Sequence, residues 1–139
     1  MRGAFLAVIV GLLAACDAMV PSPIPPIDYD TQDVRGVMRW VSRWVGFESD
    51  GINPTIAPPW VTYDRQLGNC EDISILAMYL LQRDLGIDSA MAVYLTPEGF
   101  HARVAVDGEY WEPQIGLRTS AEPLYTIPYD NAMALAGVR

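Results

Sequence analysis

The chain has 139 residues, enough for one domain and not comfortably for two. It is 51% hydrophobic and 19% charged, which is typical of a globular protein rather than a disordered one. The formal net charge is −8 and every basic side chain is an arginine, so we expect no nucleic-acid partner, because phosphates would be repelled. One His and two Cys cannot complete a four-ligand zinc site without carboxylates, and no phosphate-binding glycine motif occurs. We therefore expect neither a metal nor a cofactor.

The first fifteen residues have the pattern of a secretory signal peptide, with a basic start, an apolar run and small residues before Cys16. The stretch "LAAC", residues 13–16, resembles a bacterial lipobox, in which cleavage precedes a cysteine that carries a diacylglycerol. That resemblance implies a protein of the bacterial cell envelope, anchored to a membrane through Cys16 and facing the periplasm or the exterior. A plain signal peptide with a chance cysteine is the alternative. If Cys16 is lipidated, Cys70 has no disulfide partner within the chain.

Residues 16–30 are rich in proline and are expected to form an extended tether, followed by one domain over residues 31–139. A helix is predicted over residues 31–47, capped by Asp30 or Thr31. Its apolar stripe has helical spacing: Val34, Val37, Met38, Val41 and Val45. Trp40 and Trp44, one turn apart beside this stripe, are interpreted as packing residues.

Residues 48–66 are predicted to be a loop, because Pro58 and Pro59 oppose a regular helix. A second helix is expected to begin at Asn69 and Cys70 and to end at Gly86, a residue suited to the left-handed conformation. Its predicted buried stripe is Ile73, Leu76, Ala77, Leu80 and Leu81.

Three strands are predicted next, over residues 88–95, 100–106 and 109–114, with a two-residue turn at Asp107-Gly108. Residues 115–139 give a weak signal, and within them residues 121–139 allow one more edge strand and a short helical end. The order of elements predicts an α+β fold, with the N-terminal helices packed on one face of a small antiparallel sheet. We expect a monomer.

The predicted hairpin places several polar side chains on one face of the sheet. A two-residue turn pairs Val106 with Glu109, and alternation then places four polar residues on the same side: His101, Arg103, Glu112 and Gln114. His101, the only histidine, therefore has a carboxylate and a carboxamide beside it. Such neighbours orient a catalytic imidazole.

Cys70 is predicted at a helix N-terminus, where exposed N–H groups and the helix dipole favour the thiolate form. Glu71 and Asp72 partly offset this effect, although both can point away from the sulfur. They also suit an anchor for the first turn or for a facing loop, with Arg65 or Arg103 as a possible partner.

The stretch from "GNCEDISILAMYLLQRDLGIDSAMAVY" through "HARVAV" to "YWEPQ" resembles the transglutaminase-like superfamily, above all its bacterial cysteine peptidases. The resemblance covers residues 60–115, near half of the chain after the signal peptide. It implies a papain-like fold and a triad of Cys70 as nucleophile, His101 as base and acid, and Glu112 as the orienting acid, where the family commonly has Asp. Thioester chemistry on a peptide or another amide of the envelope follows from that triad. The oxyanion is expected to bind the Cys70 N–H and a second donor, with candidates Gln66, Trp60 and Tyr63.

Two alternatives stay open at the level of sequence. If Arg103 pairs with Glu112 across the strands, then Gln114 becomes the better orienter of His101. If Cys70 is only a small buried hydrophobe, the domain is a catalytically inactive binding module at the membrane surface. Transfer to an amine in place of water is a minor variant of the enzyme hypothesis.

Overall fold

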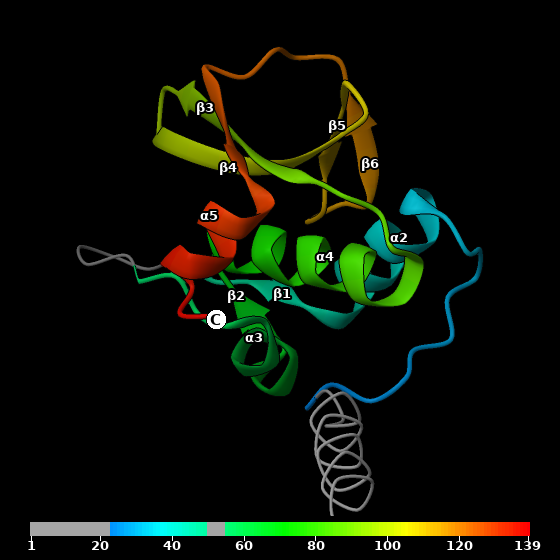
Figure 1. Ribbon diagram of the computed structural model, residues 1–139. Helices are drawn as coiled ribbons and strands as arrows, with labels where there is room; N and C mark the ends of the chain where they lie inside the picture. Colours follow the sequence, from blue (N-terminus) through cyan, green and yellow to red (C-terminus); the bar gives the residue numbers. More distant parts are fainter. Residues whose placement is uncertain (1–22, 50–54) are drawn as a thin grey trace, which may run out of the picture.

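The computed structural model describes residues 23–49 and 55–139, and these form an α+β fold. Four helices and seven strands occur in this part of the chain (Figure 1). The helices are α2 (Val34–Trp44), α3 (Pro59–Arg65), α4 (Cys70–Leu85) and α5 (Tyr129–Leu135). The strands are β1 (Gly46–Phe47), β2 (Leu67–Gly68), β3 (Ala90–Thr96), β4 (Gly99–Val106), β5 (Glu109–Glu112), β6 (Leu117–Thr119) and β7 (Tyr125–Pro128).

Five strands form an antiparallel sheet in the order β6-β5-β4-β3-β7. The register predicted for the Asp107-Gly108 hairpin is confirmed, because Val106 pairs with Glu109 and Val104 with Trp111. Asp107 takes the positive φ of 48° that this tight turn requires. The hairpin therefore has the register that local sequence rules lead one to expect.

Helix α4 is the centre of the core, and α2 and α5 lie on the same side of the sheet (Figure 1). Its fully buried apolar residues meet the inner face of β3 and β4, where Met91 and Val104 are also buried. Its C-terminus closes at Gly86 in the left-handed conformation, as the sequence predicts. The expected packing of helices on one face of an antiparallel sheet is thus present.

Helix α2 is shorter than the sequence predicts. It runs over Val34–Trp44, and its N-cap is Asp33 rather than Asp30 or Thr31. The Asp33 carboxylate accepts from the Gly36 N–H at 2.8 Å and from the Thr31 hydroxyl at 2.7 Å. Thr31 therefore holds the capping carboxylate in place, but it is not itself the N-cap residue.

The region predicted to be a loop over residues 48–66 contains helix α3. Pro59 occupies the first turn of this helix, where its missing N–H costs nothing because that group has no partner inside a helix. The helix is held to α2 by stacked rings, with Trp44 and Tyr63 centroids 5.1 Å apart. Trp40 stacks on Trp44 as well, which supports their interpretation as packing residues.

Residues 115–139 form more structure than one edge strand. Strand β6 extends the sheet beside β5, and β7 pairs with β3 at the opposite edge. The segment between them, residues 120–124, crosses the face of the sheet that lies away from the helices (Figure 1). The Tyr94 hydroxyl donates to the Ala121 carbonyl at 2.8 Å, so this crossing is packed onto the sheet.

The proline-rich segment is not a free tether over its described part, which begins at residue 23. Ile24 and Tyr29 are buried in the core. Arg83, near the end of α4, donates to the Ile24 carbonyl at 2.5 Å, and the Tyr29 hydroxyl donates to Asp84. The packed domain thus begins before residue 31, while the predicted signal peptide and Cys16 lie outside the described residues.

Within residues 23–49 and 55–139, no helix combines the length and the apolar character that crossing a bilayer requires.

Candidate active site

The start of α4 is fixed by a capping box. The Asn69 side chain accepts from the Asp72 N–H at 2.8 Å, and the Asp72 carboxylate accepts from the Asn69 N–H at 3.2 Å. The same carboxylate accepts from the Ala57 N–H at 2.7 Å, which ties the preceding loop to the helix. Of the two acidic residues predicted to anchor the first turn of the helix, Glu71 and Asp72, it is Asp72 that does so. Its anchor in the facing loop is the Ala57 backbone, while Arg65 pairs with Glu48 and Arg103 with Glu112.

Gly68 precedes this cap because there is no room for a side chain. A Cβ at this position would lie 2.8 Å from the Asp72 Cβ and 3.1 Å from the Thr62 methyl carbon. The close approach lets β2 enter the helix directly, so that Cys70 becomes its first residue. The glycine of "GNC" thus has a packing reason that is independent of any catalytic role.

Strands β4 and β5 bring His101 and Glu112 into contact. Nε2 of His101 lies 2.5 Å from Oε2 of Glu112. The longer arm of glutamate, compared with the aspartate common in the resembled family, therefore reaches the imidazole. Gln114 contributes its backbone N–H to the other Glu112 oxygen at 3.4 Å, and its side chain has no role in orienting the ring.

Glu112 both orients His101 and pairs with Arg103, the two roles that the sequence presents as alternatives. Its Oε2 atom accepts from Arg103 Nε at 2.9 Å as well as contacting His101. Burial alone would raise the pKa of Glu112, but the hydrogen bonds from His101 and Arg103 outweigh it and hold the pKa below the ordinary value. The Arg103 guanidinium also lies 4.5 Å from the centre of the Tyr94 ring, which fixes its position. Glu112 is therefore a fixed anion on the far side of the imidazole.

Cys70 and His101 meet across the seam between α4 and the sheet. A hydrogen bond with the Cys70 thiol is the largest cause that raises the pKa of His101, followed by the bond with Glu112; burial opposes both, and the result is about 9. Because Glu112 occupies Nε2, Nδ1 is the ring nitrogen left for the sulfur. At neutral pH the imidazole is thus protonated between a sulfur and a carboxylate.

Glu71 does not point away from the sulfur. Its Oε2 lies 3.5 Å from Cys70 Sγ, close enough to accept the thiol proton. Sulfur has lone pairs as well as one proton, so a neutral thiol can donate to Glu71 and accept from protonated His101 together, whereas the bond to Glu71 is lost when the thiol ionises. The neutral thiol donates to Glu71, and the thiolate accepts from protonated His101 while the Glu71 carboxylate repels it.

The predicted oxyanion candidates do not meet the thiol. Tyr63 stacks on Trp44, Trp60 packs against the core, and Gln66 ends α3 in a left-handed conformation with φ 56°. None of the three lines the cavity that contains Cys70. The N–H groups at the first two positions of α4, those of Cys70 and Glu71, have no carbonyl partner within the helix and are better placed donors.

A cavity of about 880 Å³ contains the thiol and the imidazole together. Its lining comes from four regions that are distant in sequence: Phe47 and Ser49, then Asn69, Cys70 and Glu71, then Thr96, Glu98, Phe100 and His101, and finally Gln114 and Ile115. Gln114 therefore lines the cavity, a place that its position in the predicted hairpin did not reveal.

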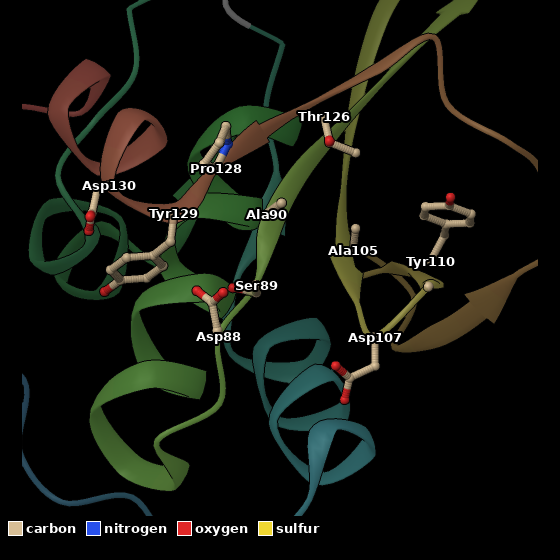
Figure 2. Close-up of a pocket in the computed structure, with 11 residues that line it drawn as sticks. Asp88, Ser89, Ala90, Ala105, Asp107, Tyr110, Thr126, Pro128, Tyr129 and Asp130 are labelled. Atoms are coloured by element: carbon tan, nitrogen blue, oxygen red, sulfur yellow. The ribbon is translucent and has the colours of Figure 1, made fainter.

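A second hollow of about 520 Å³ lies at the opposite end of β3 and β4 (Figure 2). Ala90 and Ala105, a cross-strand pair, line it, and three aspartates surround them: Asp88, Asp107 and Asp130. Neither a thiol nor an imidazole is among its lining residues. The cavity at Cys70 is therefore the one that combines a nucleophile with a base.

In the described ranges, no three or more His, Cys, Asp and Glu side chains come together in a group able to hold a metal ion.

Comparisons with protein-family models, with curated proteins and with solved structures find no match to this chain. The transglutaminase-like resemblance accordingly depends on the motifs around Cys70, His101 and Glu112 alone.

Proposed function

We propose that this protein is a cysteine hydrolase of the transglutaminase-like kind, which cleaves a peptide or another amide bond through a thioester. The observation that carries the proposal is the position of His101, which is hydrogen-bonded to Glu112 and lines the same cavity as Cys70, with the thiol close enough to raise the pKa of the imidazole. A nucleophile, a base and a group that orients the base are the three parts that this chemistry needs.

The reaction begins from the Cys70 thiolate and protonated His101. The thiolate attacks the amide carbonyl carbon, and the N–H groups of Cys70 and Glu71 stabilise the negative oxygen that forms. His101 gives its proton to the leaving nitrogen as the carbon–nitrogen bond breaks, which leaves a thioester and an amine. Water then attacks the thioester while neutral His101 accepts its proton. The acid is released, and the thiolate and protonated imidazole are restored.

Glu112 contributes by holding the ring and by favouring its protonated form. Its charge is neutralised by Arg103, which donates to the same Glu112 oxygen and whose guanidinium remains charged throughout. The anion therefore stays in place as the imidazole gains and loses its proton.

The proposed location is the bacterial cell envelope, with the domain attached to a membrane through a lipid on Cys16. The lipobox-like residues support this location, and the expected substrate is a peptide or protein found there.

A catalytically inactive binding module is the second candidate. The contact between Cys70 and Glu71 favours it, because a carboxylate 3.5 Å from the sulfur stabilises the neutral thiol. The two candidates differ in how readily Cys70 reacts below the pH at which an ordinary thiol ionises.

The test is the rate at which iodoacetamide alkylates Cys70, followed by mass spectrometry of the tryptic peptide between Arg65 and Arg83. At about pH 6, where few ordinary thiols are ionised, the enzyme hypothesis predicts rapid labelling that falls at least about tenfold in His101→Ala. Arg43→Gln, which removes an exposed ion pair with Asp30, is the control and should label like the unchanged protein. Equal rates with and without His101, in folded proteins, would favour the binding module.

A further inference from the structure

We propose that the cavity at Cys70 selects peptides in which a bulky apolar residue is followed by a basic residue next to the bond that is cleaved. This inference names the substrate class of the proposed hydrolase and rests on that function for the cleavage step alone. Recognition depends on the walls of the cavity and can be measured without any reaction.

Three large apolar side chains from separate parts of the chain surround the cavity. Phe47 follows α2, Phe100 begins β4 and Ile115 follows β5, and they are 59%, 65% and 63% exposed. A single exposed apolar residue is ordinary, but three that line one cavity form an apolar surface that a partner can cover. Burial of a substrate's apolar side chain against them would supply binding energy close to the reacting sulfur.

The charged side chains of the same cavity are acidic apart from the engaged imidazole. Glu71 and Glu98 line it, and no arginine is among the described residues that do. The nearby cations are neutralised elsewhere, since Arg103 pairs with Glu112 and Arg65 with Glu48. A cleft with one sign of charge attracts the opposite sign, so an ammonium or guanidinium is favoured and a carboxylate is repelled.

Polar groups around the sulfur suit a peptide backbone rather than an isolated side chain. The N–H groups of Cys70 and Glu71 can donate to a carbonyl, and Gln114, which lines the same cavity, has a carboxamide that can both donate and accept. In addition, β5 pairs with β4 only over Val104–Val106, so the backbone beside His101 has no strand neighbour on that side in the described sheet. An extended peptide is a ligand that such an unpaired stretch of strand backbone can accept.

The experiment uses the full chain with Cys70→Ala, so that binding is measured without cleavage. Three peptide amides are compared by calorimetry: acetyl-Ala-Phe-Lys-Ala, acetyl-Ala-Phe-Glu-Ala and acetyl-Ala-Gly-Lys-Ala. We expect the first to bind about tenfold more tightly than either of the others, and the advantage of lysine over glutamate to shrink as salt is added. Adding Glu98→Gln should remove most of the lysine preference, and adding Phe100→Ser most of the phenylalanine preference.

Both substituted side chains are exposed, so neither change threatens the fold. Leu124→Ser, an equally exposed apolar residue outside the cavity, is the matched control and should leave all three affinities unchanged. Equal binding of the three peptides would overturn the inference and leave the apolar surface for a second copy of the chain or for lipid. Selective binding together with an unreactive Cys70 would sustain the inference while refuting the hydrolase. A reactive Cys70 with unselective binding would support the hydrolase and refute the inference about peptide selectivity.

Discussion

Glu112 makes two interactions at once, one with Arg103 and one with His101. An ion pair with Arg103 and an orienting bond to His101 appear to be alternatives when only the sequence is considered. The carboxylate accepts both at the same oxygen, at 2.9 Å and 2.5 Å. Since Arg103 remains charged, it keeps Glu112 ionised in a buried site, and the ionised form is the one that favours a protonated imidazole. The arginine therefore acts on the sulfur through two intermediate groups.

The Glu71 carboxylate opposes ionisation of the Cys70 thiol, so neutralising Glu71 tests how strongly a nearby negative charge slows alkylation of the sulfur. In Glu71→Gln the carboxylate 3.5 Å from the sulfur is replaced by a neutral group of the same shape, so the thiolate loses a repulsive neighbour. We expect alkylation of Cys70 at neutral pH to become about three- to tenfold faster. Rates at several pH values provide the measurement.

Asp64→Asn, on α3 and outside the cavity, removes the same charge at a distance and is the control. It should leave the alkylation rate unchanged. A slower rate in Glu71→Gln would mean that Glu71 activates the thiol, and that the repulsion argued above is outweighed.

Among the elements, the cap of α4 links local stability to the position of the nucleophile. Asp72 is 6% exposed and accepts from two backbone N–H groups, one in the cap and one at Ala57 in the preceding loop. Asp72→Ala leaves both donors unsatisfied. We expect it to lower the free energy of unfolding by about 2–3 kcal/mol and also to slow alkylation of Cys70 at pH 6. Urea titration and the iodoacetamide assay measure the two effects.

The cap of α2 provides the comparison. Asp33→Ala removes a similar hydrogen bond, to Gly36, at a helix that does not carry the nucleophile. It should cost about 1 kcal/mol in unfolding free energy and leave the alkylation rate alone. If both variants slow alkylation equally, global loss of stability explains the effect, and the special role of Asp72 fails.

The elements also show which features the sequence could predict. The hairpin at Asp107-Gly108 and the start of α4 were predictable because turn type and capping act over a few residues. Helix α3 was missed because Pro59 was interpreted as a breaker, although proline fits the first turn of a helix. The edge strand and helical end allowed near the C-terminus correspond to β7 and α5, but β6 has no counterpart in the prediction because its three residues are too few to show an alternating pattern. Rotamers such as that of Glu71, and the place of Gln114 in the cavity, depend on packing that no local rule supplies.

At the scale of the whole molecule, strand order decides where the chemistry can occur. The sheet order β6-β5-β4-β3-β7 puts β4 in the centre, over α4, so that His101 and the first residue of the helix approach each other. The crossing segment over residues 120–124 then covers the outer face through Tyr94 and Tyr110, whose hydroxyl donates to Glu122 at 3.2 Å. The C-terminal residues therefore complete the sheet that holds the imidazole.

The same arrangement predicts how stability depends on pH. The pKa of His101 is raised from 6.5 to about 9, so its contribution is fully present below pH 6.5 and is lost as the pH rises through about 9. The pKa of Glu112 is lowered from 4.5, so its contribution is fully present above pH 4.5 and is lost as the pH falls through its folded value. Both contributions are complete between pH 4.5 and 6.5. We expect stability from this pair to be greatest there.

The measurement is the unfolding free energy of the unchanged protein minus that of His101→Gln, determined by urea titration from pH 5 to pH 9.5. Since the ring is partly exposed, solvent screening limits the expected fall in this difference to about 1–2 kcal/mol across the alkaline half of the range. The ionisable groups that contact the imidazole or line its cavity are Cys70, Glu71, Glu98 and Glu112. The same subtraction with Arg43→Gln, whose ion pair lies far from these groups, should stay flat. A flat difference for His101→Gln as well would show that folding gives the imidazole no partner, which would remove the protonated ring from the resting state of the proposed hydrolase.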